Sequence, residues 1–265
     1  MNIFLHELKA NRKSMLIWAF ALAAVTVLFF SIYPSVEKDG DQFIKVLQNY
    51  PEGVLKALGV QINTITSLLG FYSYFFLYVM LCGAIQAMNL GTGILSKEVS
   101  GKTAEFILTK PVTRAQIITA KLLAVLCTLI FTNVIFIAVS YGMAFAVATA
   151  DFNEKTFFFM SAANFFVQLV FASLGFLVSS AFSRIRSVLP LSLGTVFAFF
   201  ILSMFGSVIG DKAIRYITPF KYFDLSYIMK HSSYEPVYIS IGAAVVMAAI
   251  AASYVLFTKK DIHAA

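Results

Sequence analysis

The sequence contains little charge. Asp, Glu, Lys and Arg make up 12% of its 265 residues, whereas hydrophobic residues make up 60%. An average soluble domain is about 25% charged and about 45–50% apolar. Because a surface in contact with water needs polar residues, this chain cannot cover itself in water. The composition therefore excludes an ordinary soluble domain and predicts a protein that is embedded in a bilayer.

Cysteine and histidine are also scarce. Cys82 and Cys127 both lie in apolar stretches, so we expect small core residues and neither a disulfide nor a metal pair. The three histidines, His6, His231 and His263, are far apart in the sequence. No nucleophile is arranged with a base or a metal, so the sequence predicts no catalytic residue and no metal site.

Six apolar runs reach the length of about 20 residues that a membrane-spanning helix needs. The runs are continuous and do not alternate, which favours helices over barrel strands. The expected fold class is all-α, a polytopic membrane protein with one transmembrane domain over residues 1–265. The six expected spans are residues 15–33, 68–95, 117–148, 157–182, 188–209 and 237–257.

The distribution of positive charge predicts an orientation. Twelve of the 20 Lys and Arg residues lie on the side of the two termini, and eight lie on the other side. Under the positive-inside rule, both termini are cytoplasmic. We therefore expect a multi-pass protein of a bacterial cytoplasmic membrane. The formal charge of +7 is explained by the Lys and Arg residues of the cytoplasmic loops and does not indicate a nucleic-acid partner.

Two segments outside the spans are also patterned. In residues 1–14 the apolar side chains fall on one helical face, which predicts an amphipathic interfacial helix along the inner leaflet; a disordered basic leader is the alternative. The first span is expected to end at Tyr33, before Pro34. Residues 210–236 hold six aromatic residues among lysines, which predicts an outer segment that dips into or re-enters the interface. An ordinary loop with aromatic anchors is the alternative.

The middle of each span lacks Asp, Glu, Lys and Arg, which disfavours an ion-coupled transporter. Amides and small residues are present instead. The amides either join helices or line a path for an amphipathic substrate. These candidates are Gln86, Asn89, Asn133, Asn164 and Gln168. Small residues recur every four positions on the second span and predict close helix packing, at Gly83, Ala87 and Gly91.

The stretch between the second and third spans, residues 96–116, includes Ser-Gly-Lys-Thr, which looks like the end of a phosphate-binding loop. That loop needs a glycine where Ser96 stands, and it needs a preceding strand where a membrane helix is expected, so ATP binding is rejected. Glu98 and Lys102 are spaced to support a helix. With the apolar Phe106 near them, the stretch suits the groove of another protein. The alternative is a solvated loop.

The same stretch resembles the coupling-helix region of ABC-2 type transporter permeases. Their pattern is Glu, then Gly-Thr-x-Glu-x-Leu-Leu, then Pro-Val-Ser-Arg, then a Lys at the next span, which corresponds here to residues 97–114 and Lys121. The closing Phe-Thr-Lys-Lys-Asp-Ile, residues 257–262, resembles a common ending of that family. Lys102 departs from the pattern, because many members have glycine there. The layout of six spans is similar to that of type V ABC exporters.

The resemblance implies the membrane subunit of an ABC exporter, without a catalytic residue or a cofactor of its own. ATP and magnesium would be bound by a separate cytoplasmic ATPase in two copies, and a second permease, identical or homologous, would complete the unit. The residues implied at the ATPase contact are Glu98, Lys102, Thr103, Glu105, Phe106, Pro111 and Arg114. The alternatives are a secondary transporter or channel without an ATPase, and a membrane sensor or scaffold. Neutral, aromatic-rich spans favour a lipid-like, peptide or drug substrate.

Overall fold

The structure is a computed structural model that describes residues 3–100, 113–182 and 185–259, without the side chains of residues 97–100 and 212. Within these ranges the ordered elements are helices, and no strand occurs. The all-α class is therefore confirmed. The six long helices are α1 (Ile3–Lys38), α4 (Leu68–Ser100), α6 (Arg114–Val147), α7 (Glu154–Ala181), α8 (Val188–Ile209) and α11 (Pro236–Lys259). The short elements are α2 (Gly40–Gln48), α3 (Glu52–Ala57), α9 (Lys212–Ile217), η1 (Pro219–Lys221) and α10 (Leu225–His231).

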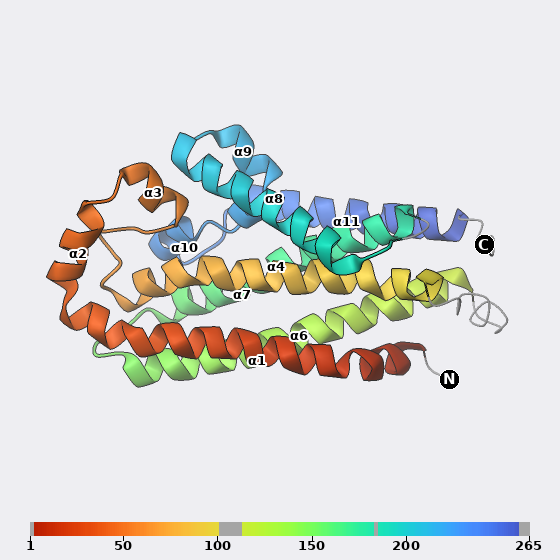
Figure 1. Ribbon diagram of the computed structural model, residues 1–265, viewed down its shortest axis with the longest axis horizontal. Coiled ribbons are helices and arrows are strands. Elements are labelled where there is room, and N and C mark those ends of the chain that lie inside the picture. The colour runs from red at the N-terminus through yellow and green to blue at the C-terminus, as the bar shows by residue number, and fades with distance from the viewer. Residues whose placement is uncertain (1–2, 101–112, 183–184, 260–265) are drawn as a thin grey trace.

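The six long helices are each long and apolar enough to cross a membrane. They run along the long axis of the molecule, with the two termini at one end and the short helices α2, α3, α9 and α10 at the other (Figure 1). We call these ends the terminal end and the distal end. Helix α4 packs along α7, α1 packs along α6, and α11 and α8 contact α7 and α4 respectively. The expected number of six spans is confirmed.

The first helix is longer than the expected span at both ends. Residues 3–38 form one uninterrupted helix, α1, so the helix expected near the N-terminus is continuous with the first span, and its place at the membrane interface stays a prediction. No glycine or proline occurs between Ile3 and Tyr33 to end the helix. Pro34 lies inside α1 and does not end it. Tyr33 is buried there and donates a hydrogen bond to the Thr66 carbonyl at 3.4 Å, which anchors this turn against the rest of the bundle.

The aromatic residues of segment 210–236 are explained by packing at the distal end. Phe220 is buried and lies against the rings of Phe171 on α7 and Phe200 on α8. Phe223 stacks on Phe166 of α7. The segment is therefore a folded cap of short helices over α7 and α8. Asp224 begins α10 by accepting a hydrogen bond from the backbone N–H of Tyr227 at 3.0 Å.

Helices α4 and α7 approach closely because glycine removes side chains at their contact. A Cβ at Gly91 of α4 would lie 2.3 Å from the carbonyl oxygen of Ala172 on α7. A Cβ at Gly175 of α7 would lie 2.8 Å from the carbonyl oxygen of Met88 on α4. Ala87, midway between Gly83 and Gly91 on α4, is fully buried. The small residues expected to permit close packing therefore lie at this contact.

We predict that Gly91→Ala destabilises the protein by about 1–3 kcal/mol, because the added methyl group meets a backbone oxygen that cannot rotate away. The measurement is the midpoint of thermal unfolding in detergent. Gly142→Ala is the matched control, since a Cβ at Gly142 on α6 meets nothing within 4 Å. An unchanged midpoint for Gly91→Ala would contradict the close α4–α7 contact.

Candidate functional site

Four of the five candidate amides meet in the centre of the bundle. Gln86 comes from α4, Asn133 from α6, and Asn164 and Gln168 from α7, and all four are buried. Asn164 Nδ2 donates to Asn133 Oδ1 at 3.0 Å, and Asn133 Nδ2 donates to Gln168 Oε1. Gln168 Nε2 donates to Gln86 Oε1 at 3.2 Å, and Gln86 Nε2 donates to Thr132 Oγ1 at 3.3 Å. The chain of bonds links three helices, and we call it the amide cluster.

The amide cluster is packed against the small residues of α4. A Cβ at Gly83 would lie 2.4 Å from Asn164 Oδ1 and 2.9 Å from Gln168 Nε2. Glycine is therefore needed at this position for α7 to bring its amides against α4. The enclosure of the cluster supports a role in joining helices over a role in lining a path. Asn89, the fifth candidate, is half-buried and makes no hydrogen bond within the described residues.

The sequence did not reveal two further members of this polar interior. Thr132 precedes Asn133 and accepts the bond from Gln86. Tyr72 is buried on α4, and its hydroxyl shares a 2.7 Å hydrogen bond with Ser161 of α7. The hydroxyl groups of Thr and Ser are ordinary in membrane helices because they can bond to the backbone of their own helix. In the sequence, only the position of Thr132 and Tyr72 on the helical faces that carry the amides could have indicated their role.

A buried ion pair lies at the terminal end. Lys121 of α6 is fully buried, and its Nζ donates to Glu7 Oε1 of α1 at 2.7 Å and to the Ile94 carbonyl of α4 at 2.7 Å. The Glu7 side chain is 13% exposed. One ammonium group therefore joins three helices beside the point where α4 leaves the bundle. The sequence placed Lys121 among the charges at the cytoplasmic face, and it did not predict that Lys121 would be buried.

The start of α6 is fixed on its other side to α11. Thr113 caps the helix in a capping box with Gln116, in which each side chain bonds to the backbone N–H of the other residue. Arg114 Nη1 donates to the Thr258 carbonyl near the end of α11 at 3.2 Å. The hydroxyls of Thr119 and Tyr254 share a hydrogen bond of 2.7 Å. We call residues 101–113, which join α4 to α6 along the chain, the connector. Helix α6, which follows it, is therefore held to both α1 and α11.

The expected ATPase-contact residues are only partly visible. Glu98 lies in the last turn of α4, and Arg114 begins α6. The others lie outside the described residues, and they are Lys102, Thr103, Glu105, Phe106 and Pro111. Over the described ranges, no group of three or more His, Cys, Asp or Glu residues could hold a metal ion.

An apolar groove runs between α6, α7 and α11 in the half of the bundle near the terminal end. Its volume is about 260 Å³, and its walls include Leu122, Leu126, Phe176 and Ile250. The polar groups along it are hydroxyls, among them that of Tyr254. The groove suits an aliphatic chain better than an ion.

Comparison with known protein families shows which family this chain belongs to, which the geometry alone does not show. The model of a family described as ABC-2 family transporter protein matches residues 1–262. The chain belongs to the ABC-2 transporter family. The resemblance noted in the connector and at the closing residues is therefore confirmed. Among curated proteins, the comparison finds no match.

Membership of the ABC-2 family makes this chain a membrane component of an ABC transporter. The six apolar helices agree with a multi-pass membrane protein. The Lys121 ion pair and the Arg114 contact both involve α6, the helix that begins at the end of the stretch that carries the resemblance.

We predict that Lys121→Met destabilises the ABC-2 protein by about 3–5 kcal/mol, because it leaves the Glu7 carboxylate enclosed without its partner. The measurement is the loss of folded protein in detergent with increasing denaturant. Lys9→Met is the matched control. Lys9 is exposed on α1, the helix that carries Glu7, so this change removes the same charge and should change stability little. The double variant Lys121→Met/Glu7→Leu should recover part of the loss. Equal stability of Lys121→Met and Lys9→Met would refute the ion pair.

We also predict that Gln168→Leu destabilises the protein by about 1–3 kcal/mol, because it removes the bonds to Asn133 and Gln86. The same unfolding measurement applies. Asn89→Leu is the matched control, since this amide makes no bond within the described residues, and it should cost less. If Asn89→Leu were the more harmful change, the amide cluster would not be what joins these helices.

Proposed function

We propose that this chain is the permease subunit through which a separate cytoplasmic ATPase drives export of an amphipathic substrate. One observation carries the proposal. The connector joins α4 to α6, and α6 is tied near its start to α1 and α4 through Lys121 and to α11 through Arg114. A movement of the connector would therefore be transmitted to four helices at once.

In this proposal, both termini and the connector face the cytoplasm. Phe106 docks in an apolar groove of the ATPase, and Glu98, Glu105 and Arg114 set the register by charge. Lys102, Thr103 and Pro111 complete the contact. Two ATPases bind ATP and magnesium and close on each other, and two permeases, identical or homologous, move with them. This chain contributes no catalytic group.

The outer surfaces of the subunit, more than its interior, support an amphipathic substrate. The amide cluster is enclosed within one subunit by α4, α6 and α7, and its amides bond to one another, except that Asn164 Oδ1 has no partner among the described residues. Large apolar side chains remain exposed on the outer faces of the long helices, for example Phe20, Phe145, Phe205 and Met247. These surfaces offer contacts to lipids, to a second permease and to a substrate with apolar parts. They offer little to a small hydrated ion.

We predict that Phe106→Asp reduces recovery of the ATPase with the tagged permease by about tenfold, because a carboxylate would have to enter an apolar groove. The measurement is the amount of co-expressed ATPase that co-purifies. Tyr50→Asp is the matched control, because it places the same charge on an exposed aromatic position at the distal end. Full recovery of the ATPase with Phe106→Asp would refute this docking role. ATP-independent transport would favour the secondary transporter.

A further inference from the structure

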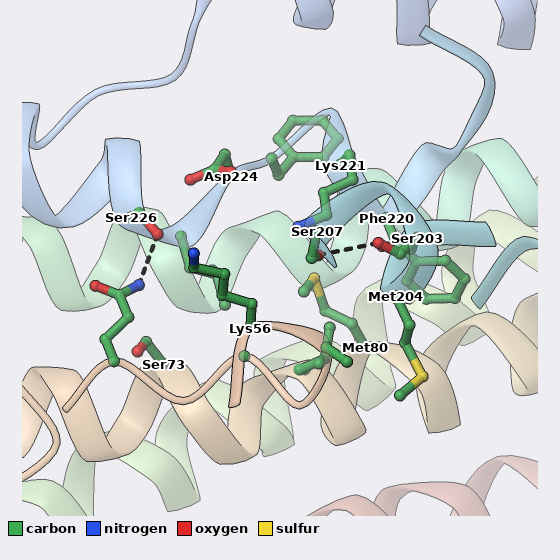
Figure 2. A pocket seen from close by; sticks show the side chains of 16 residues that line it. Lys56, Ser73, Met80, Ser203, Met204, Ser207, Phe220, Lys221, Asp224 and Ser226 are labelled. Atoms are coloured by element: carbon green, nitrogen blue, oxygen red, sulfur yellow. Dashed lines mark hydrogen bonds between the residues drawn. The ribbon is translucent and has the colours of Figure 1, made fainter. Parts of the chain in front are cut away.

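A small pocket lies at the distal end, between α3, α4, α8 and the segment that runs from η1 to α10. Its volume is about 70 Å³. That volume has room for about five water molecules, and a phosphate group has five heavy atoms. Two lysines reach the pocket from different parts of the chain, Lys56 from below and Lys221 from above in the view of Figure 2.

Lys221 is a cation of this pocket without an ion-pair partner among the described residues. It forms no ion pair with a carboxylate among residues 3–96, 113–182 and 185–259. Burial lowers the pKa of its ammonium group, and nearby Asp224 opposes that effect only in part. A half-buried cation without a close partner is costly, and an anion in the pocket would remove that cost.

The other charges around the pocket are already engaged. Lys56 forms an exposed ion pair with Glu52, one helical turn away, at 3.0 Å. Asp224 caps α10. Arg215, which lies in an adjoining hollow with Lys221, is paired with Glu235. The charged residues that line the pocket are Lys56, Lys221 and Asp224, so the lining carries a net charge of +1, which matches a ligand group of charge −1.

The pocket also offers a hydrogen-bond donor and an apolar wall. Ser226 accepts a hydrogen bond from Gln61 Nε2 at 2.6 Å, which leaves its own O–H free to donate (Figure 2). Leu77, Met80 and Met204 line the pocket beside these polar groups. A ligand with a monoanionic head and an apolar continuation would contact both kinds of surface.

We propose that this pocket binds the phosphodiester of an anionic phospholipid headgroup. Lys221 supplies the charge and Ser226 a hydrogen bond, while Lys56 attracts the anion at the mouth. The acyl region continues over the apolar wall toward the membrane-crossing faces of α4 and α8. The bound lipid fastens α3 and the α10 segment to these helices. The proposal does not depend on the ATPase partner.

The test uses the full chain purified in detergent, with lipid binding followed by native mass spectrometry and by the shift in unfolding temperature. Phosphatidylglycerol should bind and raise the unfolding temperature more than phosphatidylcholine does. Lys221→Gln should weaken phosphatidylglycerol binding about tenfold, which is what loss of a charged hydrogen bond gives. Lys230→Gln, an exposed lysine at the end of α10, is the matched control and should bind as the unaltered chain does.

Lys56→Gln gives a second variant that should fold, because the side chain is largely exposed. It should weaken binding less than Lys221→Gln does. Soluble glycerol 3-phosphate distinguishes a lipid headgroup from a free phosphate compound as the source of the bound phosphate. If it raises the unfolding temperature as much as phosphatidylglycerol does, and Lys221→Gln abolishes both effects, the pocket is a phosphate site and the lipid source is wrong. Equal binding of phosphatidylglycerol to Lys221→Gln and Lys230→Gln would overturn the proposal.

Discussion

The close approach of α4 and α7 is the contact on which the rest of the bundle depends. In lipid, apolar side chains gain little by leaving one apolar surface for another, so helices associate through close packing and hydrogen bonds. Gly83, Gly91 and Gly175 allow the two backbones to meet, and Gln168 then reaches Gln86 across the contact. Asn133 extends the hydrogen bonding to α6, and α1 packs along α6. A side chain at one of the glycines would therefore disturb polar bonds as well as packing.

The two ends of the bundle are held by different interactions. At the terminal end, Lys121 joins α6 to α1 and α4, and Arg114 joins it to α11. At the distal end, rings such as Phe220 fill the space under short capped helices. Ionic and polar bonds depend strongly on distance and direction, so the terminal end resists separation of its helices. Aromatic contacts tolerate small rotations better. A force applied at the terminal end would therefore move the helices there together.

The sequence predicted most of the architecture, because the length of an apolar run and the thickness of the bilayer are almost sufficient to locate a spanning helix. It also identified the amides, since a polar group in an apolar run is conspicuous and Asn164 and Gln168 share a helical face. It could not give their partners, which lie on other helices at positions that depend on register. It missed the burial of Lys121 because a lysine near the end of a span usually reaches the interface, and only the arrival of Glu7 from α1 changes that. The sequence also did not show that the N-terminal helix continues into the first span, because a change from amphipathic to apolar periodicity does not require a break in the helix.

These contacts limit how a transport cycle could proceed in this chain. Breaking the buried Lys121 pair would cost about 3–5 kcal/mol, and separating α4 from α7 would expose amides to hydrocarbon. A cycle that opened a path through the middle of one subunit would incur both costs on every turnover. Motion of whole subunits against each other, along the exposed apolar faces of the long helices, would incur neither. The packing of the single chain therefore favours a substrate path outside the α4–α7 core.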